Sequence, residues 1–330
     1  MSNVSAAENF ELFVHQIQKC LSKEQIISDI TRRFAYGTDA SFYRLTPKLV
    51  LRINSPEELT HVIIAAKKFN IAITFRAAGT SLSGQAITDS VLIILSSDWQ
   101  GIKVFSQGDK ISLQPGVIGA SANAALQPFS RKIGPDPASI NSCKIGGIAA
   151  NNASGMCCGV KQNSYHTLAS MKIILANGTR LDTNCEASVE DFLSTETKLV
   201  NGLQNLAKTL KENPVLLDKI KHKYRLKNTT GYGVNALIDF ENPVDIISHL
   251  MIGSEGTLGF IENITYNTIK VEPYKATGLY IFSSMRVACE LVSLLSKEQV
   301  QAVELMDSRA LNCVNKTDNK NKQQGYESNS

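Results

Sequence analysis

The 330-residue sequence has no run of about 18 apolar residues, which excludes a transmembrane helix of ordinary length. Residues 1–19 also have no basic segment followed by an apolar one, so we expect no secretory signal. Net charge is small: 34 basic and 30 acidic residues give a formal value of +4, too little to indicate nucleic acid as a partner. We therefore predict a cytoplasmic protein with at most peripheral contact at the inner face of a membrane.

Spacings typical of metal ligands are also absent. No CxxC pair occurs among the seven cysteines, so neither an iron–sulfur cluster nor a structural zinc site has a signature. We expect reduced thiols and no metal. The adjacent Cys157 and Cys158 have two interpretations, a redox pair or inert packing, and the lack of any sign of a lowered thiol pKa favours packing.

Hydrolase chemistry has no support, because neither a Ser-His-Asp order nor an HExxH motif is found. No catalytic residue is assigned. His166 remains open as a base or as a hydrogen-bonded structural residue. The basic run over residues 219–227 is also open, as a solvated face or as a patch attracted to an anionic membrane surface.

What the sequence does contain is the pattern of a folded α+β protein. Hydrophobic residues make up 43% of the chain and charged residues 19%. Helical spacing predicts a helical segment near the N-terminus, and from residue 48 strands and helices alternate. The predicted strands are 49–53, 71–75, 91–95, 102–105, 111–114, 171–175, 179–181, 258–271, 279–282 and 302–305, and the predicted helices 8–35, 55–66, 121–126, 188–211, 246–251 and 285–296.

Four clusters of small residues interrupt this pattern. They cover residues 79–84, 135–155, 231–236 and 253–259. The first has the GxxxxG spacing of a P-loop, but Gln85 and Ala86 follow instead of Lys and Ser/Thr, which rejects an ATPase. Taken alone it is either an ordinary Gly/Ser turn or an anion-binding loop.

The segment from Gly231 to Ala236 formally fits GxGxxA. A basic run precedes it instead of an apolar strand, so we read it as a turn leading into residues 237–240 and not as a dinucleotide fold. Four such clusters, each beside a strand or helix end, indicate convergence on one extended ligand that bears phosphate.

Together the loops resemble the PCMH-type FAD-binding domain of the vanillyl-alcohol-oxidase family. The segments that carry this resemblance are Arg76–Ala86, Gly134–Asn141, Ile145–Ile148, Asn152–Met156 and Ile252–Ile261. Within the family, Tyr36–Tyr43 and Asn151–Gly159 look most like FAD-linked D-lactate dehydrogenases, with glycolate oxidase flavin subunits as near neighbours. The resemblance extends from about residue 36 to residue 310.

The resemblance implies two α+β subdomains with FAD between them, followed by the start of a ferredoxin-like cap domain. Its implied boundaries are an N-terminal helical segment at 1–35, the FAD-binding domain at 36–273, an incomplete cap at 274–312 and a disordered tail at 313–330. The family's cap histidines, its acid–base group and its iron–sulfur cysteines have no counterpart in this sequence. A non-catalytic FAD-binding remnant of a longer FAD/iron–sulfur dehydrogenase is therefore the alternative to an active enzyme.

The implied reaction is hydride transfer from a small D-2-hydroxy acid to flavin N5, with electrons passing to a quinone, a cytochrome or an iron–sulfur partner. Ser81 and Leu82 stand where a covalent flavin histidine would be, so we expect dissociable FAD. The cofactor-binding residues that the resemblance implies are Arg76, Ala77, Ala78, Gly79, Thr80, Ser81, Leu82, Gln85, Pro135, Asp136, Ser139, Asn141, Ile145, Gly147, Asn152, Ser154, Gly155, Glu255, Gly256, Thr257, Leu258, Gly259 and Ile261.

Overall fold

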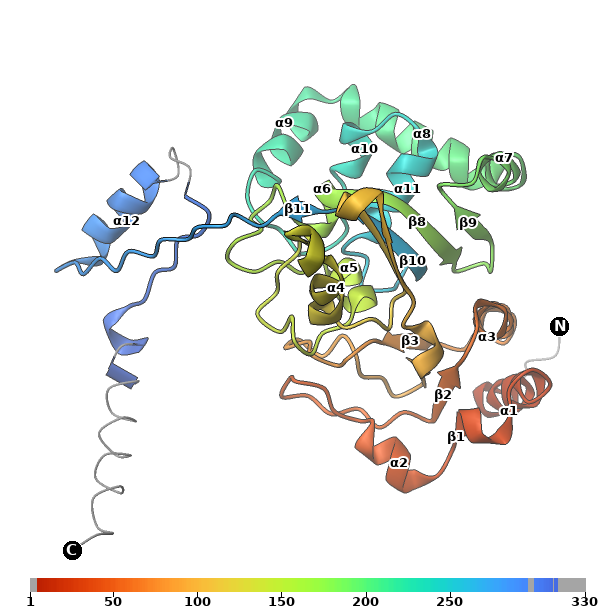
Figure 1. Cartoon of the computed structure of the whole chain (residues 1–330). Coiled ribbons are helices and arrows are strands. Elements are labelled where there is room, and N and C mark those ends of the chain that lie inside the picture. The colour runs from red at the N-terminus through yellow and green to blue at the C-terminus, as the bar shows by residue number, and fades with distance from the viewer. Residues whose placement is uncertain (1–4, 296–299, 311, 314–330) are drawn as a thin grey trace, which may run out of the picture. The chain divides into compact units, whose positions relative to one another are not determined.

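The computed structural model describes residues 5–295, 300–310 and 312–313. The chain divides into two compact units, residues 1–271 and residues 272–330 (Figure 1). The described part of the first unit contains two larger sheets and a two-stranded pair with their helices, and the mixed α+β architecture expected from the sequence is confirmed. Within the described ranges, no helix has both the length and the apolar character needed to cross a bilayer.

The first sheet is mainly parallel and lies in the N-terminal third of the chain. Its strand order is β1-β2-β4-β3, with β2, β4 and β3 parallel and β1 antiparallel at the edge. The strands are β1 (Ile26–Ile27), β2 (Leu49–Ile53), β3 (Ile73–Arg76) and β4 (Val91–Leu95). Helix α3 (Pro56–Lys68) connects β2 to β3, and its buried Leu59 and Val62 share a core with Phe13 and Ile17 of α1 (Ala6–Ile17).

Helix α3 starts as the sequence predicts. The Ser55 hydroxyl accepts a hydrogen bond from the Glu58 N–H at 3.2 Å, and Pro56 occupies the first turn. This arrangement satisfies an N–H group that the helix itself leaves free. Glu57 and Glu58 add negative charge at the positive end of the helix dipole.

The single helical segment predicted for residues 8–35 is wrong in its middle. Between α1 and α2 (Ile30–Ala35) lie a 3₁₀ turn (Lys23–Gln25) and strand β1. Asp29 caps α2 by accepting from the Arg32 N–H, and Ser22 caps the 3₁₀ turn. Two new N-caps within eight residues break the helix, and the β-branched pair between them extends the sheet.

The second sheet is antiparallel, and its central strand comes last in sequence. The order is β5-β6-β10-β8-β9, so β10 separates two hairpins that the sequence predicts correctly. The strands are β5 (Ile102–Phe105), β6 (Lys110–Leu113), β8 (Leu168–Leu175), β9 (Arg180–Asp182) and β10 (Gly259–Asn267). A separate two-stranded pair joins β7 (Arg131–Lys132) to β11 (Ile269–Lys270).

Helices around this sheet complete the larger hydrophobic core. They are α4 (Gly119–Leu126), α5 (Ile145–Asn151), α6 (Ser164–Thr167), α7 (Glu186–Thr195), α8 (Thr197–Lys211), α9 (Pro214–Lys223), α10 (Ala236–Asp239) and α11 (Pro243–Met251). Helix α5 is the one that matters for the site, because Ile145, Ile148 and Ala149 anchor it in the core.

Two predicted elements are each divided in the structure. The helix predicted over 188–211 is α7 plus α8, broken at Glu196, whose carboxylate accepts from Asn177 Nδ2 at 2.7 Å and so holds the β8–β9 turn. The strand predicted over 258–271 is β10 plus β11, interrupted at Thr268, whose N–H donates to the carbonyl of Asp109 at 3.0 Å. In both cases a tertiary hydrogen bond overrides the local pattern.

The second unit contains α12 (Met285–Leu295), close to the helix predicted at 285–296. The strands predicted at 279–282 and 302–305 are wrong, because neither segment pairs with another strand within the described residues and a strand requires such a partner. The tail predicted at 313–330 lies outside the described residues except for Cys313.

Candidate cofactor site

A cavity of about 740 Å³ opens between residues of the two subdomains, within the range of small-molecule and cofactor sites. Strands β3 and β4 contribute one wall, while β10 and α5 contribute others. Three of the four small-residue clusters expected to converge contribute loops to it, and Gly231 reaches it from the fourth, together with Thr229 and Thr230 just before that cluster. Segments far apart in sequence, from Phe75 to Ile261, are thus gathered around one space.

The first loop follows β3 and is fastened to the segment before the sheet. The Arg76 guanidinium donates to the carbonyls of Tyr36 and Thr38 at 3.1 and 2.7 Å, and the Ala40 N–H donates to the carbonyl of Gly79 at 3.0 Å. Gly79 has φ of +71°, and a Cβ there would lie 2.5 Å from the Arg76 guanidinium. Any side chain at this position would be strained by the backbone conformation and would have to displace the Arg76 guanidinium.

The backbone that follows Gly79 has N–H groups that are not used in hydrogen bonds within the described structure. Within the described part of the chain, the N–H groups of Thr80, Ser81 and Leu82 donate to no protein acceptor. All three residues line the cavity. Consecutive uncommitted N–H groups form the kind of nest that binds an anion.

Helix α5 begins against this first loop. A Cβ at Gly147 would lie only 3.2 Å from the Cβ of Ala77, and the Gly146 N–H donates to the carbonyl of Pro115 at 3.0 Å. The small residues at the start of α5 therefore let its backbone approach the loop closely. This contact brings the second cluster to the first.

The third loop, which precedes β10, is tied to the end of α5. The N–H groups of Gly253 and Glu255 donate to the carbonyls of Ala149 and Ala150 at 3.1 and 2.8 Å, and Asn151 Nδ2 donates to Glu255 Oε1 at 2.6 Å. Glu255 has a left-handed φ of +54°, a strained conformation for a non-glycine residue. Ser254 is 2% exposed, and its hydroxyl has no hydrogen-bond partner within the described structure.

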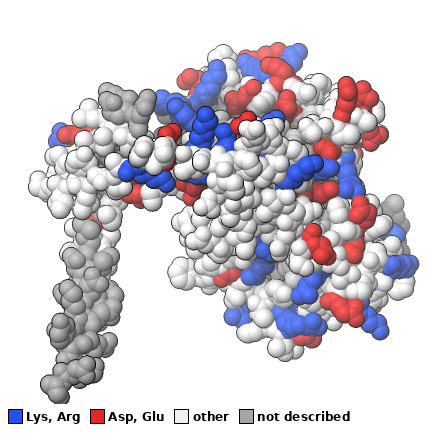
Figure 2. All heavy atoms as spheres, in the orientation of Figure 1, with Lys and Arg blue, Asp and Glu red and all other residues white. Residues whose placement is uncertain are grey.

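Charge in the cavity comes from three side chains. Arg76 and Lys144 are the cations, and Glu255 is the carboxylate. Burial raises the pKa of Glu255, although the bond from Asn151 opposes the shift. Burial lowers the pKa of Lys144. Figure 2 shows few charged side chains over the position of α4 and α5.

A fourth segment reaches the cavity through Thr229, Thr230 and Gly231. The Tyr232 hydroxyl lies 2.8 Å from Thr257 Oγ1, and Lys227 Nζ donates to the carbonyl of Ser154 at 2.6 Å. The sequence predicts a turn rather than a dinucleotide fold for the GxGxxA pattern here, and counts this cluster among the four that converge on one ligand. The absence of a preceding strand was a sound reason to reject a Rossmann turn, yet it did not exclude a wall of the site.

The structure gathers most of the predicted site residues of the first and third loops around this cavity. Those that line it are Arg76, Ala77, Ala78, Gly79, Thr80, Ser81, Leu82, Gln85, Ser139, Gly147, Glu255, Gly256, Gly259 and Ile261. Lining residues that the sequence did not single out for the site include Lys144, Asn151 and Ser254, with Phe75 and Phe260 on the apolar side. Lys144, Asn151 and Ser254 lie within the clusters at 135–155 and 253–259, and Phe75 and Phe260 lie in predicted strands, but none of the five was assigned to the site.

The other predicted residues lie outside the lining of this cavity: Pro135, Asp136, Asn141, Ile145, Asn152, Ser154, Gly155, Thr257 and Leu258. Several hold the loops in place. Asp136 accepts from the N–H groups of Gly155, Cys157 and Cys158 at 2.8, 3.0 and 3.2 Å. Ile145 is fully buried in the core, Leu258 packs against that core, and Thr257 Oγ1 donates to the carbonyl of Ser254 at 2.6 Å.

His166 and the vicinal cysteines lie away from the main cavity. His166 lines a separate small cavity of about 30 Å³, and its Nδ1 is 3.0 Å from Asn163 Oδ1. Cys158 is buried, and burial raises the pKa of its thiol, which agrees with the packing interpretation. Among the described residues, no three His, Cys, Asp or Glu side chains gather as a metal-ligand set.

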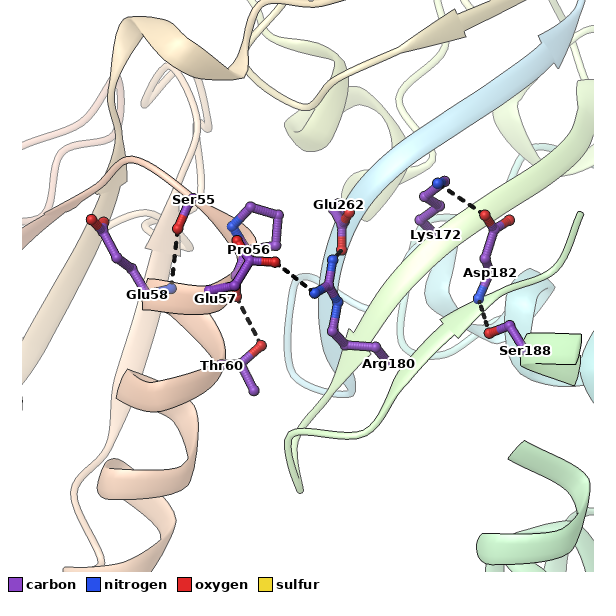
Figure 3. Close-up of polar contacts among 10 residues, drawn as sticks. All are labelled: Ser55, Pro56, Glu57, Glu58, Thr60, Lys172, Arg180, Asp182, Ser188 and Glu262. Carbon is purple, nitrogen blue, oxygen red and sulfur yellow. Dashed lines mark hydrogen bonds and ion pairs between the residues drawn. The ribbon is translucent and has the colours of Figure 1, made fainter. Parts of the chain in front are cut away.

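Beside the cavity, the two subdomains are joined by a filled seam. The Phe260 ring lies 5.2 Å from the ring of Phe75 and 5.4 Å from that of Trp99, measured between centroids. Figure 3 shows Arg180 of β9 between two carboxylates, Glu57 of α3 at 2.8 Å and Glu262 of β10 at 2.9 Å. These contacts fix the distance between the walls of the site.

The site fits a large anionic cofactor such as the FAD implied by the loops. Uncommitted N–H groups, two cations and one carboxylate belong to residues that line the cavity, and the buried hydroxyl of Ser254 has no hydrogen-bond partner within the described structure. The apolar wall of Phe75 and Phe260 suits a flat ring system. Polar groups without hydrogen-bond partners destabilise a folded protein when they are buried. The same N–H groups and cations are suited to bind a diphosphate.

Comparison with known proteins agrees with this. Residues 47–184 match the family described as the FAD binding domain. D-2-hydroxyglutarate dehydrogenase of Pseudomonas putida is 23% identical over 318 residues, which cover 94% of this chain and 31% of the relative. Glycolate oxidase subunit GlcD of Escherichia coli is 29% identical over 149 residues, covering 44% of this chain and 30% of that subunit.

A mitochondrial D-lactate dehydrogenase [cytochrome] of Arabidopsis thaliana is 21% identical over 310 residues, covering 92% of this chain and 45% of the relative. The chain thus spans less than half the length of each of these proteins. Among solved structures, an alkyldihydroxyacetonephosphate synthase gives a TM-score of 0.52 at 17% identity over 79% of this chain and 42% of that one. At such identity the likeness shows the fold.

Proposed function

We propose that this chain, whose residues 47–184 match the family described as the FAD binding domain, is the flavin-binding part of an oxidoreductase that acts on a small D-2-hydroxy acid. The observation that carries the proposal is the convergence of four distant segments on one cavity with uncommitted N–H groups. The names of the similar proteins support the substrate class, because hydroxyglutarate, glycolate and lactate are all 2-hydroxy acids.

In this proposal each loop has its own part. The N–H groups of Thr80, Ser81 and Leu82 would bind the diphosphate, and Ser139 and Gly147 would contribute to the flavin end of the site. Glu255, Gly256 and Gly259 would hold the edge of the cofactor. When bound, FAD supplies the acceptor for the hydride that leaves Cα of the hydroxy acid.

Phe75 and Phe260 exclude water from one side of the cavity. Histidine, the commonest general base, does not occur among the described residues that line this cavity. The carboxylate of Glu255 is held by Asn151. We therefore propose that the domain binds FAD firmly but oxidises a hydroxy acid slowly by itself, because a general base alone is worth about 10²–10⁴ in rate.

The lack of a lining histidine among the described residues also supports a second function, that of a non-catalytic FAD-binding protein. In the enzyme proposal, electrons pass to a quinone, a cytochrome or an iron–sulfur partner, at a cytoplasmic location with at most peripheral membrane contact. The two functions differ in whether any hydroxy acid reduces the bound flavin.

Purification and anaerobic titration test the proposal. We expect a yellow protein that releases FAD into the supernatant on acid precipitation, and slow bleaching of the flavin absorbance by D-lactate, D-2-hydroxyglutarate or glycolate. A colourless protein that takes up no added FAD would contradict the cofactor site. Complete absence of bleaching with all three acids would favour the non-catalytic function, and fast bleaching would show that the residues described here suffice.

A further inference from the structure

The two cations of the cavity differ in how they are used. The guanidinium of Arg76 donates to the Tyr36 and Thr38 carbonyls, so its hydrogen bonds hold the first loop in place. The ammonium of Lys144 forms no hydrogen bond and no ion pair with any described residue. Arg76 is thus already committed to the protein, and Lys144 is available.

Lys144 stands immediately before α5, where that helix meets the first loop. It lines the main cavity and also an adjoining open hollow of about 760 Å³, and Arg76, Ala77 and Ala78 line both spaces too. The side chain therefore shares these spaces with residues 76–78, which lead directly into the segment whose backbone N–H groups are uncommitted. The hollow also contains Asp98, but Asp98 forms no ion pair with Lys144 within the described structure.

An unpaired, half-buried ammonium is unfavourable for the folded protein. Burial removes water from the charge, and no carboxylate compensates for the loss. Lysine can escape this cost by turning its long side chain to solvent, as most surface lysines do. A cation kept at a cavity without a partner indicates that the partner is a ligand.

We propose that Lys144 provides the counter-charge for the diphosphate of FAD, beside the N–H groups of the first loop. The inference rests on the FAD site and not on the proposed substrate. It distinguishes Lys144 from Arg76, which shapes the loop, and from Glu255, which carries the wrong sign for an anion.

Binding to the flavin-free protein tests the role. Lys144→Met should weaken FAD and ADP by about tenfold, the scale of one charge-assisted hydrogen bond, and leave riboflavin unchanged because it has no phosphate. Lys144→Arg should retain most of the affinity. The matched control is Lys110→Met, which removes the same charge from an exposed position on β6 outside both spaces.

Thermal unfolding gives a second measurement, in which Lys144→Met should have opposite effects on the stability of the free protein and on its stabilisation by ADP. Without ligand, Lys144→Met should unfold at the same temperature as the parent chain or higher, because an unpaired charge is removed from a half-buried position. With saturating ADP, the stabilisation of the variant should be smaller than that of the parent. A residue that only supports the fold would lower the unfolding temperature in both conditions.

The outcomes separate the two proposals. Parent protein that binds FAD while Lys144→Met binds FAD and ADP equally well would overturn the role of Lys144 and leave the FAD site standing. Weaker FAD and riboflavin with unchanged ADP would also overturn it, by placing the charge at the flavin ring. Parent protein that binds neither FAD nor ADP would overturn both. If the Met variant fails to fold, Lys144→Gln takes its place in the same assays.

Discussion

The seam between the two subdomains is filled in one part and hollow in another. In the filled part, Phe260 packs between Phe75 and Trp99, and Arg180 pairs with carboxylates of both subdomains. In the hollow part, small residues, a strained Glu255 and an unpaired Lys144 surround a cavity. The contrast teaches that the packed side chains join the two subdomains in one place and leave room for a ligand beside it.

The largest effect on stability is expected from truncating the central side chain of the filled part. Phe260→Ala should lower the free energy of unfolding by about 3–5 kcal/mol, as for other buried Phe→Ala changes, because it leaves a cavity between two aromatic rings. Urea denaturation followed by circular dichroism measures this. Phe42→Ala is the control, since Phe42 is fully exposed and should change stability by under about 0.5 kcal/mol. If Phe260→Ala and Phe42→Ala lowered the free energy of unfolding equally, the aromatic contacts of the seam would not act as a hydrophobic core.

In the hollow part, the next largest effect should come from Gly79→Val. A branched side chain at φ of +71° meets the Arg76 guanidinium and distorts the anion-binding loop, so FAD affinity should fall by at least about 100-fold, or about 2.7 kcal/mol. Flavin absorbance after gel filtration measures retention. Gly202→Val is the control, because a Cβ at Gly202 in α8 meets nothing within 4 Å. Normal FAD retention in Gly79→Val would exclude the loop as the diphosphate site.

Removing the ion pairs of the filled part should cost less. Arg180 is 44% exposed, so Arg180→Met should lower the free energy of unfolding by about 1 kcal/mol or less. Most of that loss comes from leaving Glu262, 14% exposed, without its partner, so adding Glu262→Gln should recover part of it. Lys208→Met, in an exposed pair on α8, should have almost no effect. A double variant less stable than Arg180→Met would contradict this account.

The smallest effect concerns the pH dependence of the hollow part. Burial raises the pKa of Glu255 above 4.5, so the ionised form is disfavoured in the folded state. The stability that this group contributes is full below pH 4.5 and is lost as pH rises through the raised pKa. Glu255→Gln should therefore unfold higher than the parent chain above that pKa, by no more than about 2 °C. Exposed Glu11→Gln should show no such trend, and a gap that widens toward acid would reverse the sign we assign.

Local parts of the fold could be read from the sequence. Strands β2 and β4 fall where apolar runs predict them, and Ser55-Pro56 marks the start of α3. These features depend on residues a few positions apart. The break at Glu196 was not readable, because its cause is a hydrogen bond to the turn at Asn177.

The residues of the site also fall into those that could be predicted from the sequence and those that could not. The glycines and hydroxyls of the site were recognisable as clusters, since small residues leave a visible composition. Lys144 was not, because one lysine among 34 basic residues has no pattern of its own and acquires meaning only from the cavity beside it. Thr229 and Thr230 were not recognisable either, because they precede the cluster at 231–236 and reach the cavity only in the folded chain.

The order of strands has a consequence for the folding route. Strand β10 is central in its sheet, yet it is synthesised after both hairpins that flank it. The core of the first subdomain also waits, because Ile174 and Phe260 belong to it. Such sequence-distant pairing slows folding and leaves the edges of β6 and β8 unpaired until residues 259–267 arrive. The loop that carries Ser254 and Glu255 comes immediately before that strand, so the cavity closes in the same late step that completes the sheet.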